Sequence, residues 1–145
     1  MNDTIFRFGY PATLIADYAH WLVLLRPTQP TLGSLVLAAK DEATAFSALD
    51  PAAFAELGRV VADIEGRLSD AIGYSKINYL MLMMVDREVH FHVIPRYEGE
   101  RGTCGVAVSD AGWPKAPALG EAVDLSSAEI EALAEWLRSG WPKVR

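Results

Sequence analysis

Residues 88–96 read EVHFHVIPR, and this is the most informative stretch of the chain for both fold and function. Polar and apolar side chains alternate through it, which is the two-residue period of a β-strand whose two faces meet different surroundings. Glu88, His90 and His92 share one face, at intervals of roughly 6–7 Å at the rise of a strand. The opposite face, which should pack in the core, carries Val89, Phe91 and Val93. The stretch therefore predicts a polar site on a rigid element.

Two apolar runs nearer the N-terminus predict a β-hairpin. Residues 21–25 (WLVLL) end at Arg26 and Pro27, and residues 32–38 (LGSLVLA) follow a connection rich in proline and threonine. Because both runs are apolar at nearly every position, the sheet should be covered on both sides, although runs this short also fit a buried helix.

A further strand should precede the histidine strand. Residues 77–85 are apolar and β-favouring, and the polar pair Asp86 and Arg87 separates them from the histidines, which predicts a second hairpin. Three methionines lie in this run and are expected to pack in the core: Met81, Met83 and Met84.

Helix signals frame these strands. Asp50 and Pro51 predict an N-cap followed by proline in the first turn, and Gly73 offers a left-handed end. Ser126 and Glu129 have the spacing of a capping box, which predicts a second helix near the C-terminus. Residues 98–120, rich in glycine and proline, should form an irregular surface segment carrying Trp113. The apolar stripe expected along the first helix is Phe54, Leu57, Val61, Ile64 and Leu68.

These elements predict an α+β fold in which residues 1–145 form a single domain. An antiparallel sheet of about five strands should carry the helix that begins after Asp50, and a C-terminal helix should complete the fold. With 51% hydrophobic residues, the chain is able to bury a core of its own.

Charge and composition exclude some functions and leave others open. A net charge of −6 and an isoelectric point near 5.0 argue against binding a nucleic-acid polymer, which needs a basic stripe. The N-terminal stretch has no signal or transit pattern, and the longest apolar runs are far below the ~20 residues of a membrane helix. The single Cys104 forms no internal disulfide and fits a reducing compartment. The expectation is a cytoplasmic protein that does not associate with membranes.

Two imidazoles on one strand face suit two kinds of chemistry. A neutral imidazole can attack phosphorus while a second group orients it or balances the proton. The same pair could supply two ligands to a divalent metal, with further ligands from elsewhere. The candidates for those further ligands are few, since His20 is the only other histidine and Cys104 the only cysteine.

The stretch from His90 to Arg96, HFHVIPR, resembles the motif of the histidine triad family, His-φ-His-φ-His-φ-φ with φ apolar, which often continues into Pro-Arg. Residues 33–37 (GSLVL) are similar to the family's strand entry Gly-His-φ-φ-φ, and the intervening helix lies where the family has one. The resemblance covers residues 21–97. It places His90 at the nucleophilic middle histidine and His92 at the third, while Glu88 stands where the first histidine should be.

The resemblance implies a homodimer and a two-step reaction on a nucleoside phosphate ligand. His90 would attack the α-phosphorus of a phosphoramidate, ester or dinucleoside polyphosphate, and water would then release the nucleotide; the reaction needs no metal and no cofactor. Candidate contacts to the phosphate or ribose are Arg26, Asn78 and Arg96.

Glu88 makes three interpretations possible. An ionised carboxylate 4 Å from a phosphate would repel it by about 4 kcal/mol at an effective dielectric of 20, which would damage the site. It could instead serve as an acid that protonates the leaving group, or be a solvated turn residue with no role. The rival functions are therefore a nucleotide-binding protein with little or no turnover, and a metal-binding protein that uses His90 and His92.

Overall fold

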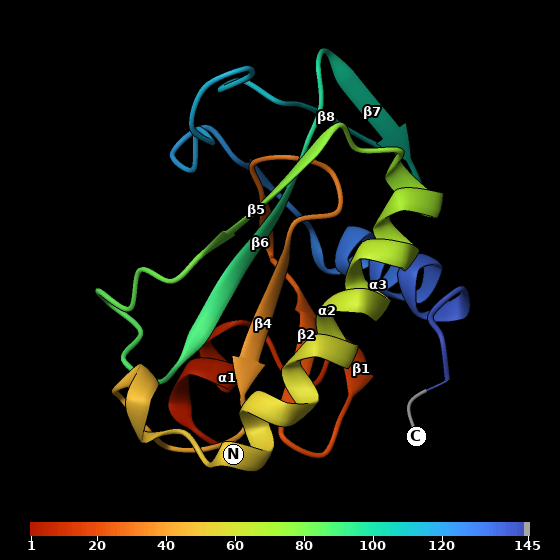
Figure 1. The fold of residues 1–145 in the computed structure, drawn as a ribbon. Helices are drawn as coiled ribbons and strands as arrows, with labels where there is room; N and C mark the ends of the chain where they lie inside the picture. Colours follow the sequence, from red (N-terminus) through yellow and green to blue (C-terminus); the bar gives the residue numbers. More distant parts are fainter. Residues whose placement is uncertain (144–145) are drawn as a thin grey trace.

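The computed structural model describes residues 1–143 and has the predicted α+β architecture. The helices are α1 (Asp3–Arg7), the 3-10 helix η1 (Phe46–Ala48), α2 (Pro51–Ile72) and α3 (Ser127–Ser139). The strands are β1 (Leu14–Asp17), β2 (Trp21–Leu25), β3 (Thr28–Gln29), β4 (Leu35–Ala39), β5 (Lys76–Leu80), β6 (His90–Arg96), β7 (Glu100–Thr103), β8 (Val106–Ser109) and β9 (Val123–Asp124). Figure 1 shows how they are arranged.

A five-stranded antiparallel sheet forms the centre of the fold, as predicted, with the strand order β1-β2-β4-β6-β5. The hairpin of β2 and β4 is confirmed, with Trp21 opposite Ala39 and Leu25 opposite Leu35. The strand that carries the histidines, β6, lies between β4 and β5 and is hydrogen-bonded on both edges. This interior position restricts the backbone beneath the two imidazoles.

The long helix α2 begins and ends as its sequence predicts. Asp50 caps it by accepting a hydrogen bond from the Ala52 amide at 2.8 Å, and Gly73 ends it in the left-handed conformation (φ 64°). The predicted stripe is wrong in its first turn, since Phe54 is 41% exposed and Ala53 faces the sheet instead. There the Trp21 indole donates to the Ala53 carbonyl at 2.8 Å. The side chains of α2 that are fully buried are Ala53, Val60, Ile64, Leu68 and Ile72.

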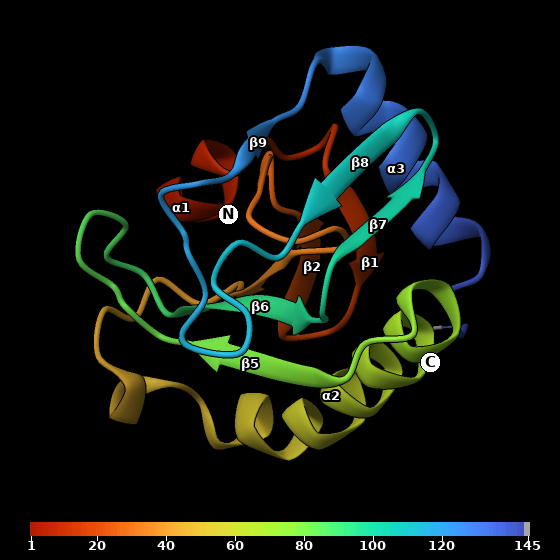
Figure 2. The ribbon, with the colours of Figure 1, turned by 90° about the horizontal axis from the view of Figure 1, so that it is seen from above.

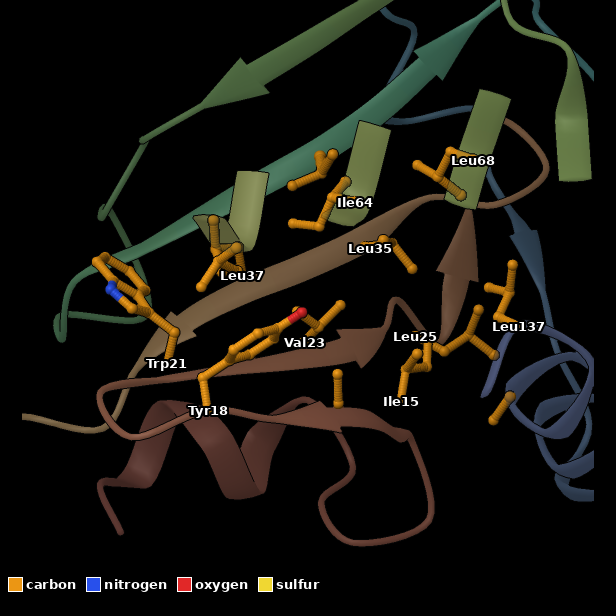
Figure 3. Close-up of a cluster of buried hydrophobic side chains, with 14 of the residues drawn as sticks. Ile15, Tyr18, Trp21, Val23, Leu25, Leu35, Leu37, Ile64, Leu68 and Leu137 are labelled. Atoms are coloured by element: carbon orange, nitrogen blue, oxygen red, sulfur yellow. The ribbon is translucent and has the colours of Figure 1, made fainter. Parts of the chain in front are cut away.

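The C-terminal helix α3 starts with the predicted capping box. The Glu129 amide donates to Ser126 Oγ at 3.2 Å, and the Ser126 amide donates to Glu129 Oε1 at 2.8 Å. Leu137 of this helix packs near Leu25 and Ile15, in the same cluster as the side chains beneath α2 (Figure 3). Helices α2 and α3 therefore cover one face of the sheet together.

The opposite face of the sheet has a smaller cover. Ile5 of α1 packs there against a cluster of buried sheet residues: Leu22, Leu24, Val36 and Ala38. Figure 2 shows α2 on one side of the sheet, with α1 and the segment 110–122 on the other. Because His90 and His92 pair with Ala38 and Val36, both imidazoles belong to the face covered by α1.

The predicted strand 77–85 is shorter than expected. It leaves the sheet after Leu80, and Met84 and Val85 are 84% and 79% exposed, so the expected core position of Met84 is wrong. Met81 and Met83 are partly buried against the core, as expected. The last pair of β5 and β6 is Leu80 with His92, and Val89, just before β6, bonds on the other side: the Ala39 amide donates to its carbonyl at 3.0 Å, and its own amide donates to the Ala43 carbonyl at 3.1 Å.

Several further elements were not predicted. Residues 98–120 are not wholly irregular, since β7 and β8 form a hairpin in which Val106 and Val108 are buried while Ala107 and Ser109 are exposed. The N-terminal stretch supplies α1 and the edge strand β1. No helix within residues 1–143 combines the length and apolar character required to cross a bilayer.

The burial pattern of α2 yields a direct test. Leu68→Ala should lower the free energy of unfolding by about 2–5 kcal/mol, because Leu68 is fully buried and the substitution leaves a cavity. Phe54→Ala, on the predicted but exposed part of the stripe, should cost well under that amount. Urea unfolding of the two variants measures the difference. Equal losses of stability in the two variants would mean that Phe54 is buried, as the sequence predicts, and would contradict its exposure in the structure.

Candidate active site

The two histidines of β6 line a small pocket on the α1 face of the sheet. His90 and His92 are 2% and 7% exposed, and the pocket has a volume of about 220 Å³. Arg26 forms one wall. The rest of the lining comes from Phe8, just after α1, and from the β5–β6 connection: Leu82, Met83, Met84, Val85 and Asp86. The polar side chains at this pocket are the two imidazoles, Arg26 and Asp86, and the other lining residues are apolar.

The ring orientation and proton position of His90 are set by a main-chain contact. His90 Nδ1 lies 2.7 Å from the carbonyl oxygen of Glu88. A carbonyl oxygen can only accept, so Nδ1 carries the hydrogen, and in the neutral ring Nε2 keeps its lone pair. A neutral imidazole with a free Nε2 is the form required of a nucleophile.

His92 has the opposite proton arrangement. Arg26 Nε donates to His92 Nδ1 at 3.3 Å, so the hydrogen of the neutral ring lies on Nε2. Burial, with smaller contributions from the charges of Arg26 and His90, lowers the pKa of His92 to about 4. The two rings lie edge to face with centroids 5.1 Å apart. With both rings neutral, the pair therefore presents one acceptor nitrogen, on His90, and one donor N–H, on His92.

Arg26 provides the positive charge of the pocket. Its Nη1 donates to the Thr28 carbonyl at 2.8 Å and also to the Thr28 hydroxyl, so its hydrogen-bond partners are uncharged. No ion pair involving Arg26 occurs within residues 1–143. Burial lowers the pKa of its guanidinium, an effect that an anionic ligand would offset. This predicted site residue lies in the histidine pocket.

Phe8 is the aromatic wall of the pocket and was not identified from the sequence. Its ring centroid lies 5.6 Å from each imidazole. Asn2 caps α1 by accepting from the Ile5 amide at 3.1 Å, and its Nδ2 donates to the Ala39 and Asp41 carbonyls. The helix is thereby fixed to the end of β4, and this places Phe8 over the histidines. A five-residue helix offers no periodic signal by which it could have been found.

Glu88 is placed differently from the expectation that its carboxylate borders the phosphate. The residue is 6% exposed, so it is no solvated turn residue. Its Oε1 accepts from the Thr4 amide at 3.1 Å and from Thr4 Oγ1 at 3.0 Å. The side chain lines a separate cavity together with Asp3 and Arg87. Glu88 thus contacts the start of α1 with its carboxylate and His90 with its carbonyl.

Asn78 and Arg96 meet each other but lie outside the histidine pocket. Arg96 Nη1 donates to Asn78 Oδ1 at 2.8 Å, and its Nε and Nη2 bind both oxygens of Asp110 at 2.7 and 3.0 Å. This buried ion pair compensates the charge of Arg96. Both residues line a second cavity, further along the same face of the sheet.

The residues considered as additional metal ligands are not brought to the histidines. His20 lies in the β1–β2 turn, where its amide donates to Glu56, and Cys104 is exposed in the β7–β8 turn. In the part of the chain that the structure describes, no group of three His, Cys, Asp or Glu side chains could hold a metal ion.

The fold and the position of the histidines can be compared with known proteins. A histidine triad protein from Sinorhizobium meliloti 1021 superposes with a TM-score of 0.73 at 23% identity, over 96% of this chain and 94% of that one. One from Bradyrhizobium japonicum gives 0.71 at 19% identity, over 96% and 95%. The diadenosine triphosphate hydrolase of Plasmodium falciparum gives 0.67 at 10% identity, over 89% and 76%. No protein-family model and no curated protein matches the sequence. The chain therefore has the fold of the histidine triad proteins.

The environment of His92 predicts its titration. Since the pKa is lowered from 6.5 to about 4, imidazole ¹⁵N shifts of His92 should remain those of a neutral ring down to pH 5. In Arg26→Gln the pKa should rise toward 6.5 without reaching it, because burial, the larger cause, remains. The unfolded chain binds this proton first, so His92 should lower stability progressively as pH falls from 6.5 to about 4. A wild-type midpoint near 6.5 would contradict the burial of His92.

The contacts of Glu88 predict that two substitutions at this position differ in their effect on stability. Glu88→Ala should lower the free energy of unfolding by about 1–3 kcal/mol, because it leaves the buried amide and hydroxyl of Thr4 without an acceptor. Glu88→Gln keeps an acceptor oxygen and should stay near wild type. Thermal or urea unfolding measures both. If the alanine variant were as stable as wild type, the carboxylate would not be what anchors α1.

Proposed function

We propose that this protein is a nucleotide-phosphate hydrolase or transferase in which His90 forms a covalent nucleotidyl intermediate. Its substrates would be nucleoside phosphoramidates, phosphate esters or dinucleoside polyphosphates. The observation that carries the proposal is the 2.7 Å contact between His90 Nδ1 and the Glu88 carbonyl, which leaves Nε2 of a buried imidazole available as a nucleophile. The sequence motif and the shared fold support the same reaction.

In the first step, the lone pair of His90 Nε2 forms a bond to the α-phosphorus, and the bond from phosphorus to the leaving atom breaks. The leaving group departs with that electron pair, and the nitrogen of a phosphoramidate takes up a proton from solvent as it leaves. The non-bridging oxygens of the phosphorus gain stabilisation from the Nε2–H of His92 and from the charge of Arg26. Throughout, the hydrogen on His90 Nδ1 stays bound to the Glu88 carbonyl, which favours the cationic ring of the intermediate.

In the second step, water attacks the same phosphorus and the phosphorus–nitrogen bond breaks. Its electron pair returns to His90 Nε2, the water loses a proton to solvent, and the nucleotide is released. The exposed β5–β6 connection borders the pocket and leaves it open to solvent on that side. An acceptor other than water would make the same intermediate serve a transferase.

We assign Glu88 a positioning role and not that of an acid or a damaged triad member. The contact that orients His90 uses the main-chain carbonyl, which any residue at this position supplies. The carboxylate hydrogen-bonds to Thr4 and lines a different cavity, so its charge is directed away from the phosphate position. Catalysis therefore does not require a histidine side chain at position 88.

The ligand class rests on comparison as well as on chemistry. One superposed protein is a diadenosine triphosphate hydrolase, and another, from Sulfolobus tokodaii, is described as a hypothetical histidine triad nucleotide-binding protein. A phosphate beside Arg26, with an apolar wall of Phe8 and Leu82 near it, suits a nucleotide.

A cytoplasmic homodimer completes the proposal. Strand β5 is an edge of the sheet, and an apolar cavity of about 190 Å³ lies beside it on the α2 face. Its lining residues include Leu57, Tyr79 and Phe91, and a second copy would remove them from water. Light scattering of the purified protein tests the dimer.

Nucleotide binding without turnover is the second candidate, because Glu88 replaces a histidine at the site. A metal site at His90 and His92 has less support, since Arg26 donates to Nδ1 of His92 and thereby leaves the hydrogen on Nε2, and no group of three His, Cys, Asp or Glu side chains within residues 1–143 could hold a metal ion. Turnover distinguishes the first two candidates, and metal content of the purified protein tests the third.

His90→Ala should lower nucleotide release by at least about 1,000-fold, as removal of a covalent nucleophile does, and should abolish the trapped nucleotidyl adduct. His20→Ala is the matched control, since that histidine lies outside the pocket, and it should keep wild-type turnover. Single-turnover assays with adenosine 5′-phosphoramidate and diadenosine tetraphosphate measure both variants. An adduct of wild-type yield in His90→Ala would rule out the proposed nucleophile. Wild-type protein that binds these ligands without releasing product would favour the second candidate.

A further inference from the structure

A second cavity of about 580 Å³ lies on the same sheet face as the histidines and plays no part in the two steps above. Strands β5 and β6 form its floor, through Lys76, Asn78 and Arg96, and the segment 110–122 lies over it with Trp113 and Lys115. Figure 2 shows this segment crossing above the two strands, on the side opposite α2.

The strand register relates this cavity to the histidine pocket. Leu80 pairs with His92, Asn78 with Ile94, and Lys76 with Arg96, and directly opposed residues share a face. At the rise of a strand, Asn78, opposite Ile94, lies about 13 Å and Lys76, opposite Arg96, about 20 Å along the sheet from the level of His90. A ligand that reacts at His90 and also fills this cavity must be longer than a mononucleotide.

The cavity is positively charged within a protein of net charge −6. The charge of Arg96 is compensated by Asp110, but Lys76 and Lys115 form no ion pair within residues 1–143. Asn78 accepts from Arg96 through Oδ1, which directs its Nδ2 hydrogens toward the cavity. Two ammonium groups and an amide N–H₂ are donors suited to phosphate oxygens and unsuited to a cationic ligand.

Trp113 differs from the other tryptophans of the chain. Trp21, Trp136 and Trp141 pack against the main hydrophobic core, whereas Trp113 is half-buried at the cavity and belongs to neither core cluster. An indole face in such a position can stack on a planar base.

The segment that carries Trp113 is folded tightly and fixed to the sheet. A Cβ at Gly112 would lie 2.2 Å from the Ala116 carbonyl oxygen, so only glycine allows the chain to turn back on itself there. The Lys115 amide donates to the Gly112 carbonyl at 2.7 Å, and Asp110 binds the segment to Arg96 of β6. These contacts therefore hold Trp113 and Lys115 in place beside the cavity.

We propose that this cavity binds the leaving half of the substrate and selects a leaving group that is both anionic and aromatic, namely a nucleoside phosphate. The inference rests on the proposed function and narrows its substrate class to dinucleoside polyphosphates. The base stacks on Trp113, and Lys76, Lys115 and Asn78 bind the phosphates between it and the reacting phosphorus. Amine leaving groups of phosphoramidates are too short to reach the cavity, and cationic ones are repelled by it.

The charge balance of the first step agrees with this assignment. When His90 Nε2 bonds to the α-phosphorus, the bridging oxygen leaves with the bonding electron pair and becomes a terminal phosphate oxygen of the departing nucleoside phosphate. That group gains one negative charge on the side of the sheet where Lys76 and Lys115 lie. The cavity thus stabilises the leaving group as the bond breaks.

The test compares two substrates across matched variants. Trp113→Ala and the double variant Lys76→Ala/Lys115→Ala should raise KM for diadenosine tetraphosphate at least about tenfold, the effect of losing one stacked base or its phosphate contacts. Both should leave kcat/KM for adenosine 5′-phosphoramidate within about twofold of wild type. Trp113→Phe keeps an aromatic face and should recover most of the loss, and Lys143→Ala, an exposed lysine outside the cavity, should change neither substrate.

Equal effects on both substrates, or none on either, would overturn the assignment. A binding measurement decides the matter even without turnover: calorimetry of a methylene-bridged diadenosine tetraphosphate analogue against adenosine monophosphate. Tighter binding of the analogue that Trp113→Ala abolishes supports the site, and equal affinities overturn it. Failure of the proposed function is distinct, because it is the absence of product or of a His90-dependent adduct with wild-type protein.

Discussion

The hydrogen bond from His90 Nδ1 to the Glu88 carbonyl is the interaction on which the proposed chemistry depends. Without it, the hydrogen could lie on either nitrogen, and the lone pair would not be directed at the pocket. The contact of Arg26 with His92 complements it, because it places the second hydrogen on Nε2. The pocket thus contains an acceptor nitrogen on His90 and a donor N–H on His92, each determined by one neighbour, beside the partly buried cation Arg26.

Two arginines that look equivalent in the sequence have different surroundings. Arg26 meets the neutral oxygens of Thr28, so its charge remains available to an anion. Arg96 binds both oxygens of Asp110, a residue that is separated from it by the β7–β8 hairpin. This ion pair compensates the charge of Arg96 and holds the segment 110–122 against β6. Neither the spacing nor the type of the two residues could have indicated that Arg96 is paired with a carboxylate and that the partners of Arg26 are uncharged.

The features that could be predicted from the sequence depend on contacts between neighbouring residues. The predictions failed where contacts between distant segments determine the structure. The caps of α2 and α3 were read correctly because Asp50, Gly73 and the Ser126–Glu129 pair act within one helical turn. Residues 77–85 have strand character throughout, but β5 ends at Leu80, opposite His92 of β6, a limit set by pairing between strands and not by the composition of the run. The motif placed His90 and His92 on a strand, whereas Phe8 reaches them only because Asn2 fixes α1 to β4.

Position 88 shows how a motif residue can change while its function in the site is kept. What His90 needs from this position is a carbonyl oxygen, which belongs to the main chain and survives any substitution that leaves the backbone in place. The side chain is then free to take another task, and in Glu88 it accepts two hydrogen bonds from Thr4 in the first turn of α1. That helix precedes Phe8, whose ring contacts both imidazoles. Glu88 therefore contacts His90 through its carbonyl and α1 through its carboxylate, and that carboxylate lines a cavity other than the histidine pocket.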